Sequence, residues 1–273
     1  DAFEGLNTMD ALMDPQRRPA LLEQIRSESA YELDNSTRAV EGKPKAARSA
    51  TPPAEHIPQV ASWGPRVVRE MPLEIVAKHL SKNELFRLSW GAKNTHGEDW
   101  ARLLGEYEQR LDAMLRQAAK EGWLKPQGVY GCWPAQADGN DLVLYQPESL
   151  QSSNPVELLR FPFPRQENGE TLCLADYFAP ADSGKMDVAA FQIVTVGQAA
   201  SERFDRLQEA GDYSEAYFTH GLAVQMAEAA ADYLHNHIRR ELGLDAEQGK
   251  RYSWGYPAIP ELTDHAKVFS LLP

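Results

Sequence analysis

Cysteine is scarce in this chain of 273 residues, and so are long apolar runs and positive charge. The two cysteines, Cys132 and Cys173, belong to no CxxC or Cys/His pattern, which argues against disulfides and structural zinc. No apolar run approaches the ~20 residues of a membrane span, and nothing at the N-terminus resembles a signal peptide. Lysine and arginine total 28 against 40 acidic residues, a net charge of −12. We therefore expect neither nucleic acid nor an anionic membrane as a partner, and we expect a cytoplasmic location.

Several cofactor and catalytic motifs are also missing from the sequence. It contains no GxxxxGKS/T loop, no GxGxxG after a predicted strand and no GxSxG elbow, so nucleotide phosphates and an esterase-type serine are not expected. We interpret Gly128, Gly131 and Gly139 as marks of a hairpin. His235 and His237 lie two apart on a predicted helix and point away from each other, whereas zinc favours a four-residue spacing. We therefore expect no metal site, and no catalytic acid–base pair is evident.

The order of the helical and strand patterns predicts an α+β fold. Residues 2–35 show helical spacing that breaks around Asp14-Pro15, and residues 41–58 (EGKPKAARSATPPAEHIP) have the composition of a flexible linker. Helices are then predicted over 72–80, 84–91, 98–121, 198–242 and 265–272, and strands over 128–136, 141–146, 157–164, 171–180 and 188–197. This order favours an antiparallel-rich central sheet with long flanking helices, preceded by a helical leader and a linker.

Two stretches are candidates for a binding site. RYSWGYPAIP, residues 251–260, combines a cation, three aromatic rings, a glycine and two prolines. Such a proline-braced loop can seat a small anionic ligand, although the same residues also suit an ordinary aromatic edge turn. Glu228 lies among alanines on a predicted core-facing helix, so we expect its carboxylate to be buried and paired. Its partner is either a protein cation such as Arg251 or a cationic group of a ligand, and composition does not separate the two.

Several blocks of the sequence resemble the C-terminal activation domain of cobalamin-dependent methionine synthase. They are GVYGCWPAQADGNDLVLY, LADYFAP, SGKMDVAAFQIVTVG, HGLAVQMAEAAADYLHNHIRRELG and RYSWGYPAIPELTDH, and their order and spacing hold across most of residues 65–270. The leader DAFEGLNTMDALMD is similar to the last helix of the cobalamin-binding domain in that family and starts inside a helical pattern. The resemblance implies a piece of a longer protein: residues 1–40 end a cobalamin-binding domain, 41–58 form a linker and 59–273 form the activation domain.

The resemblance implies a function in the reductive reactivation of methionine synthase. In that family the domain binds S-adenosylmethionine and positions its methyl group for transfer to cob(I)alamin. The cob(I)alamin is made by one-electron reduction of inactive cob(II)alamin, with flavodoxin or a similar electron donor. The adjacent cobalamin-binding domain of the same enzyme would hold the cobalamin, since the DxHxxG motif that ligates cobalt does not occur in this sequence. The alternatives are a non-catalytic S-adenosylmethionine-binding or docking module and a purely structural domain.

The same resemblance implies which residues contact S-adenosylmethionine. Arg251 would offer its guanidinium fork to the ligand carboxylate, and Gly255 would let the backbone approach the ligand closely. Tyr256 would lie beside the methyl group. Ser253 replaces a small residue that contacts the ligand through its backbone, and Glu228 would face the cationic end of the ligand.

The sequence departs from the family pattern at two places. Ser81 stands where the family has an aspartate that contacts the ligand's ammonium group. Family members also usually continue past the position of Pro273 with another helix and a strand that carries a ligand-side tyrosine. Both departures predict weaker binding of the ligand.

Overall fold

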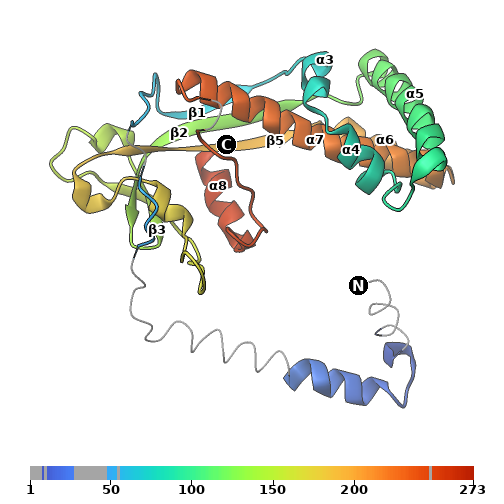
Figure 1. Ribbon diagram of the computed structural model, residues 1–273, viewed down its shortest axis with the longest axis horizontal. Coiled ribbons are helices and arrows are strands. Elements are labelled where there is room, and N and C mark those ends of the chain that lie inside the picture. Colours follow the sequence, from blue (N-terminus) through green and yellow to red (C-terminus); the bar gives the residue numbers. More distant parts are fainter. Residues whose placement is uncertain (1–7, 9–10, 28–47, 54–55, 246–247) are drawn as a thin grey trace. The chain divides into compact units, whose positions relative to one another are not determined.

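The computed structural model describes residues 8, 11–27, 48–53, 56–245 and 248–273 (Figure 1). The chain divides into two compact units, Asp1–Ala47 and Arg48–Pro273. In the first unit, residues 11–13 and 18–27 are helical, and the predicted break at Asp14-Pro15 is confirmed. The backbone carbonyl of Asp14 accepts a hydrogen bond from Arg18 N at 2.9 Å, which starts the second helical segment. Most of the predicted linker is either outside the described residues or already part of the second unit.

The second unit is built on one antiparallel sheet with a long central strand, β2 (Gln127–Asp138). Strand β5 (Asp187–Thr195) pairs with β2 along one edge, from Gln127 to Ala135. On the other edge, β1 (Gly64–Val68) pairs with the first half of β2 and β3 (Asp141–Tyr145) with its last four residues. Strand β4 (Glu157–Pro162) extends the sheet beyond β3. The predicted α+β fold with an antiparallel-rich sheet is therefore confirmed.

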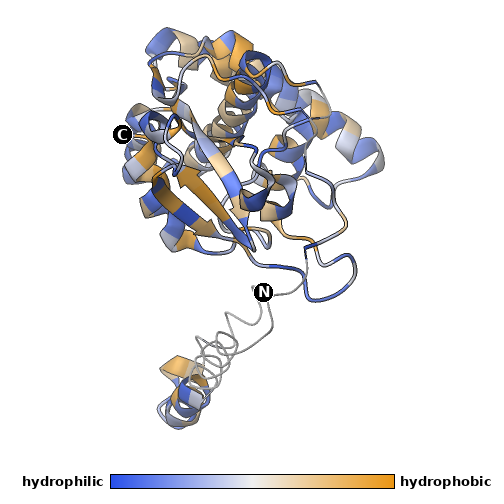
Figure 2. Cartoon of the chain, turned by 90° about the vertical axis from the view of Figure 1, so that its left-hand side faces the viewer, coloured by the Kyte–Doolittle hydropathy of each residue, from blue (hydrophilic) through white to orange (hydrophobic). Residues whose placement is uncertain are grey.

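Each face of the sheet is covered by helices, so there are two apolar cores (Figure 1). Helix α7 (Tyr213–Glu241) crosses one face. Four further helices lie around α7 and extend this layer beyond the strands (Figure 1): α3 (Leu73–Val76), α4 (Lys82–Glu84), α5 (Gly97–Glu121) and α6 (Gln198–Glu209). Helix α8 (His265–Leu271) packs on the opposite face. Successive side chains of β2 point to opposite faces of the sheet, so this strand contributes to both cores. Tyr130 lies in the core on the α7 face, and Trp133 lies in the core on the α8 face. Figure 2 shows the apolar residues concentrated on the strands between these helices.

The glycines of β2 have a different function from the predicted one. Only Gly139 lies at the hairpin turn, with a φ of 64°. Gly128 and Gly131 lie inside the strand where other groups come very close: a Cβ at position 131 would be 2.6 Å from the Gly64 carbonyl oxygen and from the Trp133 ring. Gly131 therefore allows close packing of β1 and of the Trp133 ring, and Gly128 allows close packing of Met71 and Leu234, whose side chains would be 2.8 and 2.9 Å from its Cβ.

Two further predictions of local structure are wrong, and one strand was missed. The strand predicted over 171–180 is instead a 3₁₀ helix, Leu174–Tyr177, whose residue Asp176 is held in an ion pair with Arg165. The helix predicted over 198–242 is two helices, because Gly211 adopts a φ of 77° and Asp212 caps the start of α7. Strand β1 was not predicted, since its alternation is short and begins with Gly-Pro.

Candidate functional site

Helix α7 carries a row of polar residues on one face. Glu228, Asp232, His235 and Arg239 are spaced by four, three and four residues, which places them on one side of the helix. After α7 ends, the chain turns back along this side. Leu244 N donates to the Arg239 carbonyl at 2.9 Å, and the Arg239 guanidinium donates to the carbonyl of Asp245. The returning segment, which we call the arginine loop (residues 248–256), thus runs antiparallel to α7.

The arginine loop meets α7 again at Glu228. Arg251 Nη2 donates to Glu228 Oε2 at 3.1 Å, so two residues that are 23 positions apart in sequence form an ion pair. The side chains are 29% and 56% exposed, respectively. The prediction that Glu228 is buried is wrong: Ala229, Ala230 and Ala231 face the core, and Glu228 lies on the outer side of the same helical turn. Of the two partners considered for this carboxylate, the protein cation is the one observed.

The second half of the arginine loop is held in shape by its own backbone. Gly255 has a φ of 91°, a conformation that side chains with a Cβ rarely adopt, and its N–H donates to the Ile259 carbonyl at 2.9 Å. Ile259 N donates in return to the Tyr256 carbonyl at 2.8 Å, closing a tight turn. Trp254 stacks on Phe191 in the α8 core, with ring centroids 6.3 Å apart. The loop is therefore pinned to α7 at one end and to the opposite core at the other.

The remaining predicted site residues are on the arginine loop and on the segment before α4. Tyr256 is 65% exposed, and Ser253 is half-buried within the loop. Ser81 caps α4, with its Oγ accepting a hydrogen bond from Glu84 N at 3.3 Å. The segment that carries Ser81 packs on the polar side of α7, because His79 Nδ1 lies 2.6 Å from Asp232 Oδ2. Arg251 and Glu228 are thus in direct contact, and Ser81 belongs to a neighbouring element.

His235 also belongs to this region, although its place in the sequence was interpreted only in terms of zinc binding. Its side chain is half-buried on the polar side of α7. Burial lowers the pKa of His235, and the nearby charges of Arg239 and Arg251 lower it further. The charge of Asp232 and the backbone of Gly249 act in the opposite direction without reversing the shift. The spacing along α7 was the available signal for this residue.

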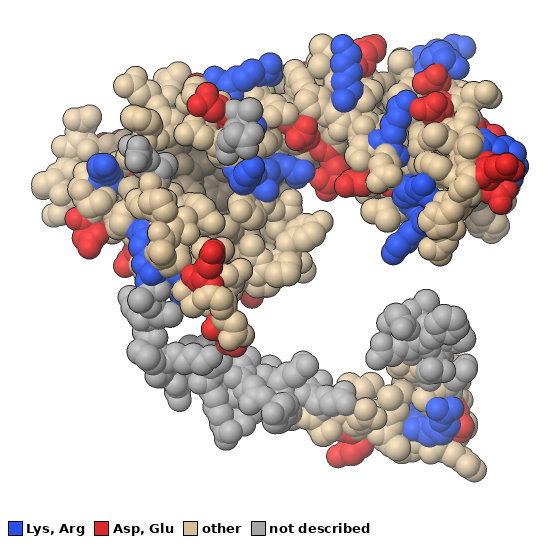
Figure 3. Space-filling view, in the orientation of Figure 1, with Lys and Arg blue, Asp and Glu red and all other residues tan. Residues whose placement is uncertain are grey.

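The charges on this side of the molecule are mixed. In Figure 3, acidic and basic side chains alternate along the part of the surface that α7 occupies, with no broad patch of one sign. Such a surface suits a small ligand that carries both charges better than it suits a polyanion. Within the described residues, no group of three or more His, Cys, Asp or Glu side chains could hold a metal ion. Burial raises the pKa of the Cys132 thiol to about 11, so this cysteine is not a ready thiolate.

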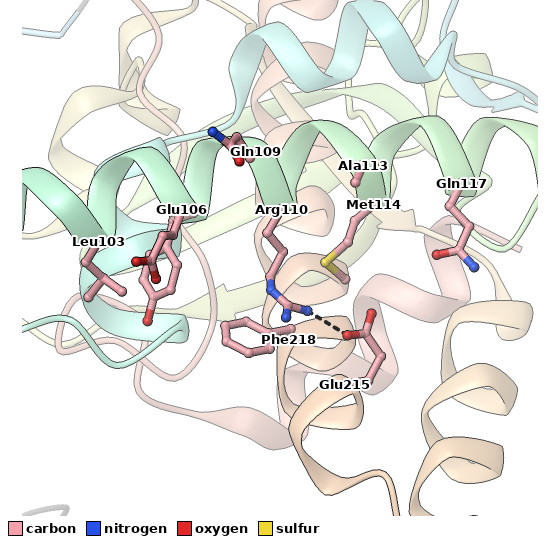
Figure 4. Close-up of a pocket in the computed structure, with 10 residues that line it drawn as sticks. Leu103, Glu106, Gln109, Arg110, Ala113, Met114, Gln117, Glu215 and Phe218 are labelled. Atoms are coloured by element: carbon pink, nitrogen blue, oxygen red, sulfur yellow. Dashed lines mark hydrogen bonds and ion pairs between the residues drawn. The ribbon is translucent and has the colours of Figure 1, made fainter.

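A separate groove of about 680 Å³ lies between α5 and the first turns of α7 (Figure 4). Arg110 projects across it from α5, pairs with Glu215 at 2.6 Å and lies 4.1 Å from the Phe218 ring centroid. Phe218 and Glu228 are ten residues apart on α7, or about 15 Å along the helix axis. The groove is therefore distinct from the arginine loop, and its Arg110 and Glu215 already neutralise each other. None of the helices in the described part of the chain is long and apolar enough to cross a membrane.

Comparison with known proteins identifies the family. The family model described as "Vitamin B12 dependent methionine synthase, activation domain" matches residues 106–273, the part that contains α7 and the arginine loop. The chain belongs to this family. The resemblance inferred from the sequence is thereby confirmed.

Relatives and a solved structure agree with this assignment. The chain is similar to the methionine synthase of Mycobacterium tuberculosis, with 32% identity over 319 aligned residues, and to that of Mycobacterium leprae, with 30% identity. Each alignment covers the whole chain but 26% of the relative, so the chain spans about a quarter of the length of these enzymes. A crystal structure of the MetH reactivation domain bound to AdoHcy matches with a TM-score of 0.65 and 28% identity, over 84% of this chain and 74% of that one.

Proposed function

We propose that this activation domain binds S-adenosylmethionine between α7 and the arginine loop and positions its methyl group for transfer to reduced cobalamin. The observation that carries the proposal is the Arg251–Glu228 ion pair, which places one cation and one anion side by side at a partly exposed site. The amino-acid end of S-adenosylmethionine presents a carboxylate beside ammonium and sulfonium charges. The two side chains are therefore complementary to this end of the ligand.

The residues would divide the recognition of the ligand between them. The planar guanidinium of Arg251 would pair with the ligand carboxylate through two parallel hydrogen bonds. Glu228, released from Arg251, would face the ligand's positive charges. Gly255 keeps the loop in a turn that no other residue adopts as readily, so the exposed Tyr256 and the half-buried Ser253 are held in place before the ligand arrives. Ser81 would lie at the border of the same site.

When bound, S-adenosylmethionine supplies a methyl group that is attached to a sulfonium sulfur. After the methyl group is transferred, this sulfur is part of a neutral thioether. The thioether product is S-adenosylhomocysteine, the molecule named with the similar reactivation domain. The acceptor is a strong nucleophile and the sulfonium a good leaving group, so the domain need not provide a general base. Its own residues would bind and orient the donor.

The proposal includes partners from the whole enzyme. Cobalamin would be held by the cobalamin-binding domain of the same methionine synthase, and residues 1–40 would be the end of that domain. A flavodoxin or a similar protein would deliver the electron that converts inactive cob(II)alamin to the acceptor form. The activity of the complete enzyme would be the synthesis of methionine from homocysteine.

Calorimetric titration of the chain with S-adenosylmethionine tests the binding step. We expect Arg251→Ala to weaken binding by roughly tenfold, the low end for a charge-assisted hydrogen bond, because wild-type Arg251 must first leave Glu228. Arg251→Lys should recover only part of the loss, because an ammonium lacks the fork. Arg116→Ala, at an exposed position on α5, is the matched control. Wild-type affinity in the Arg251→Ala variant would show that the site is wrongly assigned.

A second assay separates reactivation from simple binding. The chain is mixed with S-adenosylmethionine and the reduced cobalamin-binding domain, and formation of methylcobalamin is followed by absorbance. Methyl transfer that depends on Arg251 supports the proposal. Tight binding without methyl transfer would instead favour a docking or regulatory module.

A further inference from the structure

The carboxylate of Asp232 lies one helical turn beyond Glu228 on the polar side of α7. The two residues are four positions apart, a spacing that places their Cβ atoms about 5–6 Å from each other. The Asp232 side chain is 47% exposed, so a ligand that lies along this side of the helix can reach it. Asp232 takes no part in the ion pair between Arg251 and Glu228. It is therefore a second carboxylate beside the proposed site.

Two neighbours hold Asp232 in place through one of its oxygens. His79 Nδ1 lies 2.6 Å from Oδ2, and Asn236 Nδ2 donates to the same oxygen at 3.2 Å. The His79 ring is itself packed edge-on against Tyr233, with the ring centroids 5.7 Å apart. Within the residues that the structure describes, no hydrogen bond to Oδ1 is formed. Asp232 thus has one oxygen fixed by the protein and one that is open to a ligand.

The charges of S-adenosylmethionine call for more than one carboxylate. The ligand carries one anion, its carboxylate, and two cations, the ammonium and the sulfonium. Arg251 would pair with the carboxylate, and the ammonium, which is bonded to the same carbon atom, would then lie next to Glu228. The sulfonium is further along the methionine chain, at a separation from the ammonium that is comparable to one helical turn. This is the spacing between Glu228 and Asp232.

We propose that Asp232 is a further ligand-binding residue, which faces the sulfonium and so distinguishes S-adenosylmethionine from S-adenosylhomocysteine. The inference rests on the proposed function, which locates the amino-acid end of the ligand at Arg251 and Glu228. In the transfer step the bond between sulfur and methyl breaks, its electron pair stays on the sulfur, and the methyl group passes to the reduced cobalamin. The sulfur is then neutral, so its attraction to Asp232 is lost and release of the product is favoured.

Three variants of the full chain test this contact. Asp232→Asn keeps the shape of the side chain and an acceptor for His79 and Asn236, but it removes the charge. Asp232→Glu keeps the charge. Asp112→Asn, at an exposed position on α5, is the matched control, because it changes the net charge of the chain by the same amount. Since Asp232 is half exposed, the melting temperature of Asp232→Asn should stay within about 4 °C of wild type.

Calorimetric titration at neutral pH with S-adenosylmethionine and with S-adenosylhomocysteine measures the two affinities of each variant. We expect Asp232→Asn to bind S-adenosylmethionine about three- to tenfold more weakly than wild type, the effect of one charge about 5 Å away at a protein surface. Its affinity for S-adenosylhomocysteine, which has no sulfonium, should stay within about twofold of wild type. Asp232→Glu should keep most of the wild-type ratio of the two affinities, and Asp112→Asn all of it. Glu228→Gln should weaken both ligands to a similar extent, because both carry the ammonium.

The same titrations show which outcomes contradict the proposal. An equal loss of both affinities in Asp232→Asn would exclude a contact with the sulfonium, and an equal change of the ratio in Asp112→Asn would show an effect of net charge alone. If wild type bound S-adenosylmethionine and Asp232→Asn kept the wild-type ratio, the proposed function would stand and the role of Asp232 would be wrong. If wild type bound neither ligand, both would be wrong.

Discussion

Replacement of Asp176 by asparagine should strongly destabilise the second unit. The Asp176 carboxylate is almost completely buried, with its side chain 1% exposed, and the partner Arg165 is 5% exposed. Arg165 donates hydrogen bonds to both carboxylate oxygens, from Nη1 to Oδ2 at 2.6 Å and from Nη2 to Oδ1 at 2.8 Å. Ser49 N donates to Oδ2 at 3.2 Å, and the Arg48 guanidinium donates to the Asp176 and Phe178 carbonyls. One side chain thus joins the start of the unit to its interior.

The expected decrease in the free energy of unfolding comes from the positive charge of Arg165, which remains buried in the variant. Asparagine is nearly isosteric with aspartate, but it leaves the buried Arg165 guanidinium without a counter-ion. Removing one partner of a buried pair costs about 3–5 kcal/mol, and the retained amide oxygen places Asp176→Asn near the lower value. For a unit of this size, a loss of about 3 kcal/mol lowers the melting temperature by roughly 6–12 °C. The exposed Lys82–Glu108 pair provides the control, since Glu108→Gln should change stability by less than about 1 kcal/mol.

The same residue makes the stability depend on pH. Burial alone would raise the pKa of Asp176, but the hydrogen bonds from Arg165 and Ser49 and the charge of Arg165 outweigh it and lower the pKa to about 2. Since the folded-state pKa lies below the unfolded value of ~4, the carboxylate contributes about 2 kcal/mol at neutral pH. This contribution is lost as the pH falls from about 4 to 2.

Calorimetric melting of wild type, Asp176→Asn and Glu108→Gln between pH 2 and pH 7 measures both effects. The gap in melting temperature between wild type and Asp176→Asn should be wide at pH 7 and should narrow as the pH approaches 2. A melting temperature for Asp176→Asn within about 2 °C of wild type at pH 7 would refute the reasoning. So would a gap that stays constant down to pH 2.

Three other predictions concern the close packing, the ion pair and the chain before the second unit. Gly131→Ala should destabilise by about 1–3 kcal/mol in denaturant unfolding, because its Cβ would lie 2.6 Å from a β1 carbonyl, whereas Gly105→Ala, in open space on α5, should stabilise by up to ~1 kcal/mol. Glu228→Gln should change the ligand-free melting temperature by less than about 4 °C, as expected for an exposed pair, but it should reduce the rise in melting temperature that S-adenosylmethionine causes. A large decrease in the ligand-free melting temperature with an unchanged ligand-induced rise would contradict the role of Glu228 in ligand binding. Trypsin should cut within residues 41–47 before it cuts after Arg48, because the Arg48 guanidinium is hydrogen-bonded to the Phe178 carbonyl. Early cleavage after Arg48 would show that this hydrogen bond does not hold Arg48 in place.

Elements with a long, clear period were predictable from the sequence. Helix α5 follows its 3.6-residue apolar stripe, and Gly122 ends it in the left-handed conformation, with its N–H bonded to the Ala118 carbonyl at 2.8 Å. The β2–β3 hairpin follows from Asp-Gly between two apolar runs, and the register pairs Asp138 with Asp141. In both cases the determining residues are close in sequence, so local preference and final structure agree.

The missed elements depend on partners distant in sequence. TLCLADYFAP reads as a strand because apolar and aromatic residues dominate it, but Asp176 in its middle is drawn into an ion pair with Arg165. The start of the activation domain at residue 59 stays a prediction, made because residues 41–58 contain few apolar side chains. Arg48 and Ser49 are anchored through polar contacts, which a search for apolar residues does not detect.

The candidate site shows the same division. Arg251, Gly255 and Tyr256 are close in sequence, so the pattern of the loop indicated them together. The partner of Glu228 remained open from the sequence, because Arg251 is 23 positions away and comes beside it only after the chain reverses. The anchor Trp254 was not singled out, since its role depends on Phe191 of β5, a residue on another element.

The position of the arginine loop links the two cores of the second unit. Arg251 is held on the α7 face through Glu228, whereas Trp254, three residues later, is packed into the core on the α8 face. The chain must therefore pass from one face of the sheet to the other within these residues. A ligand that takes Arg251 away from Glu228 would loosen the α7 end while Trp254 keeps the other end fixed. Such a loop can exchange one ion pair for another without losing its place, which suits a site that must bind its ligand and later release the product.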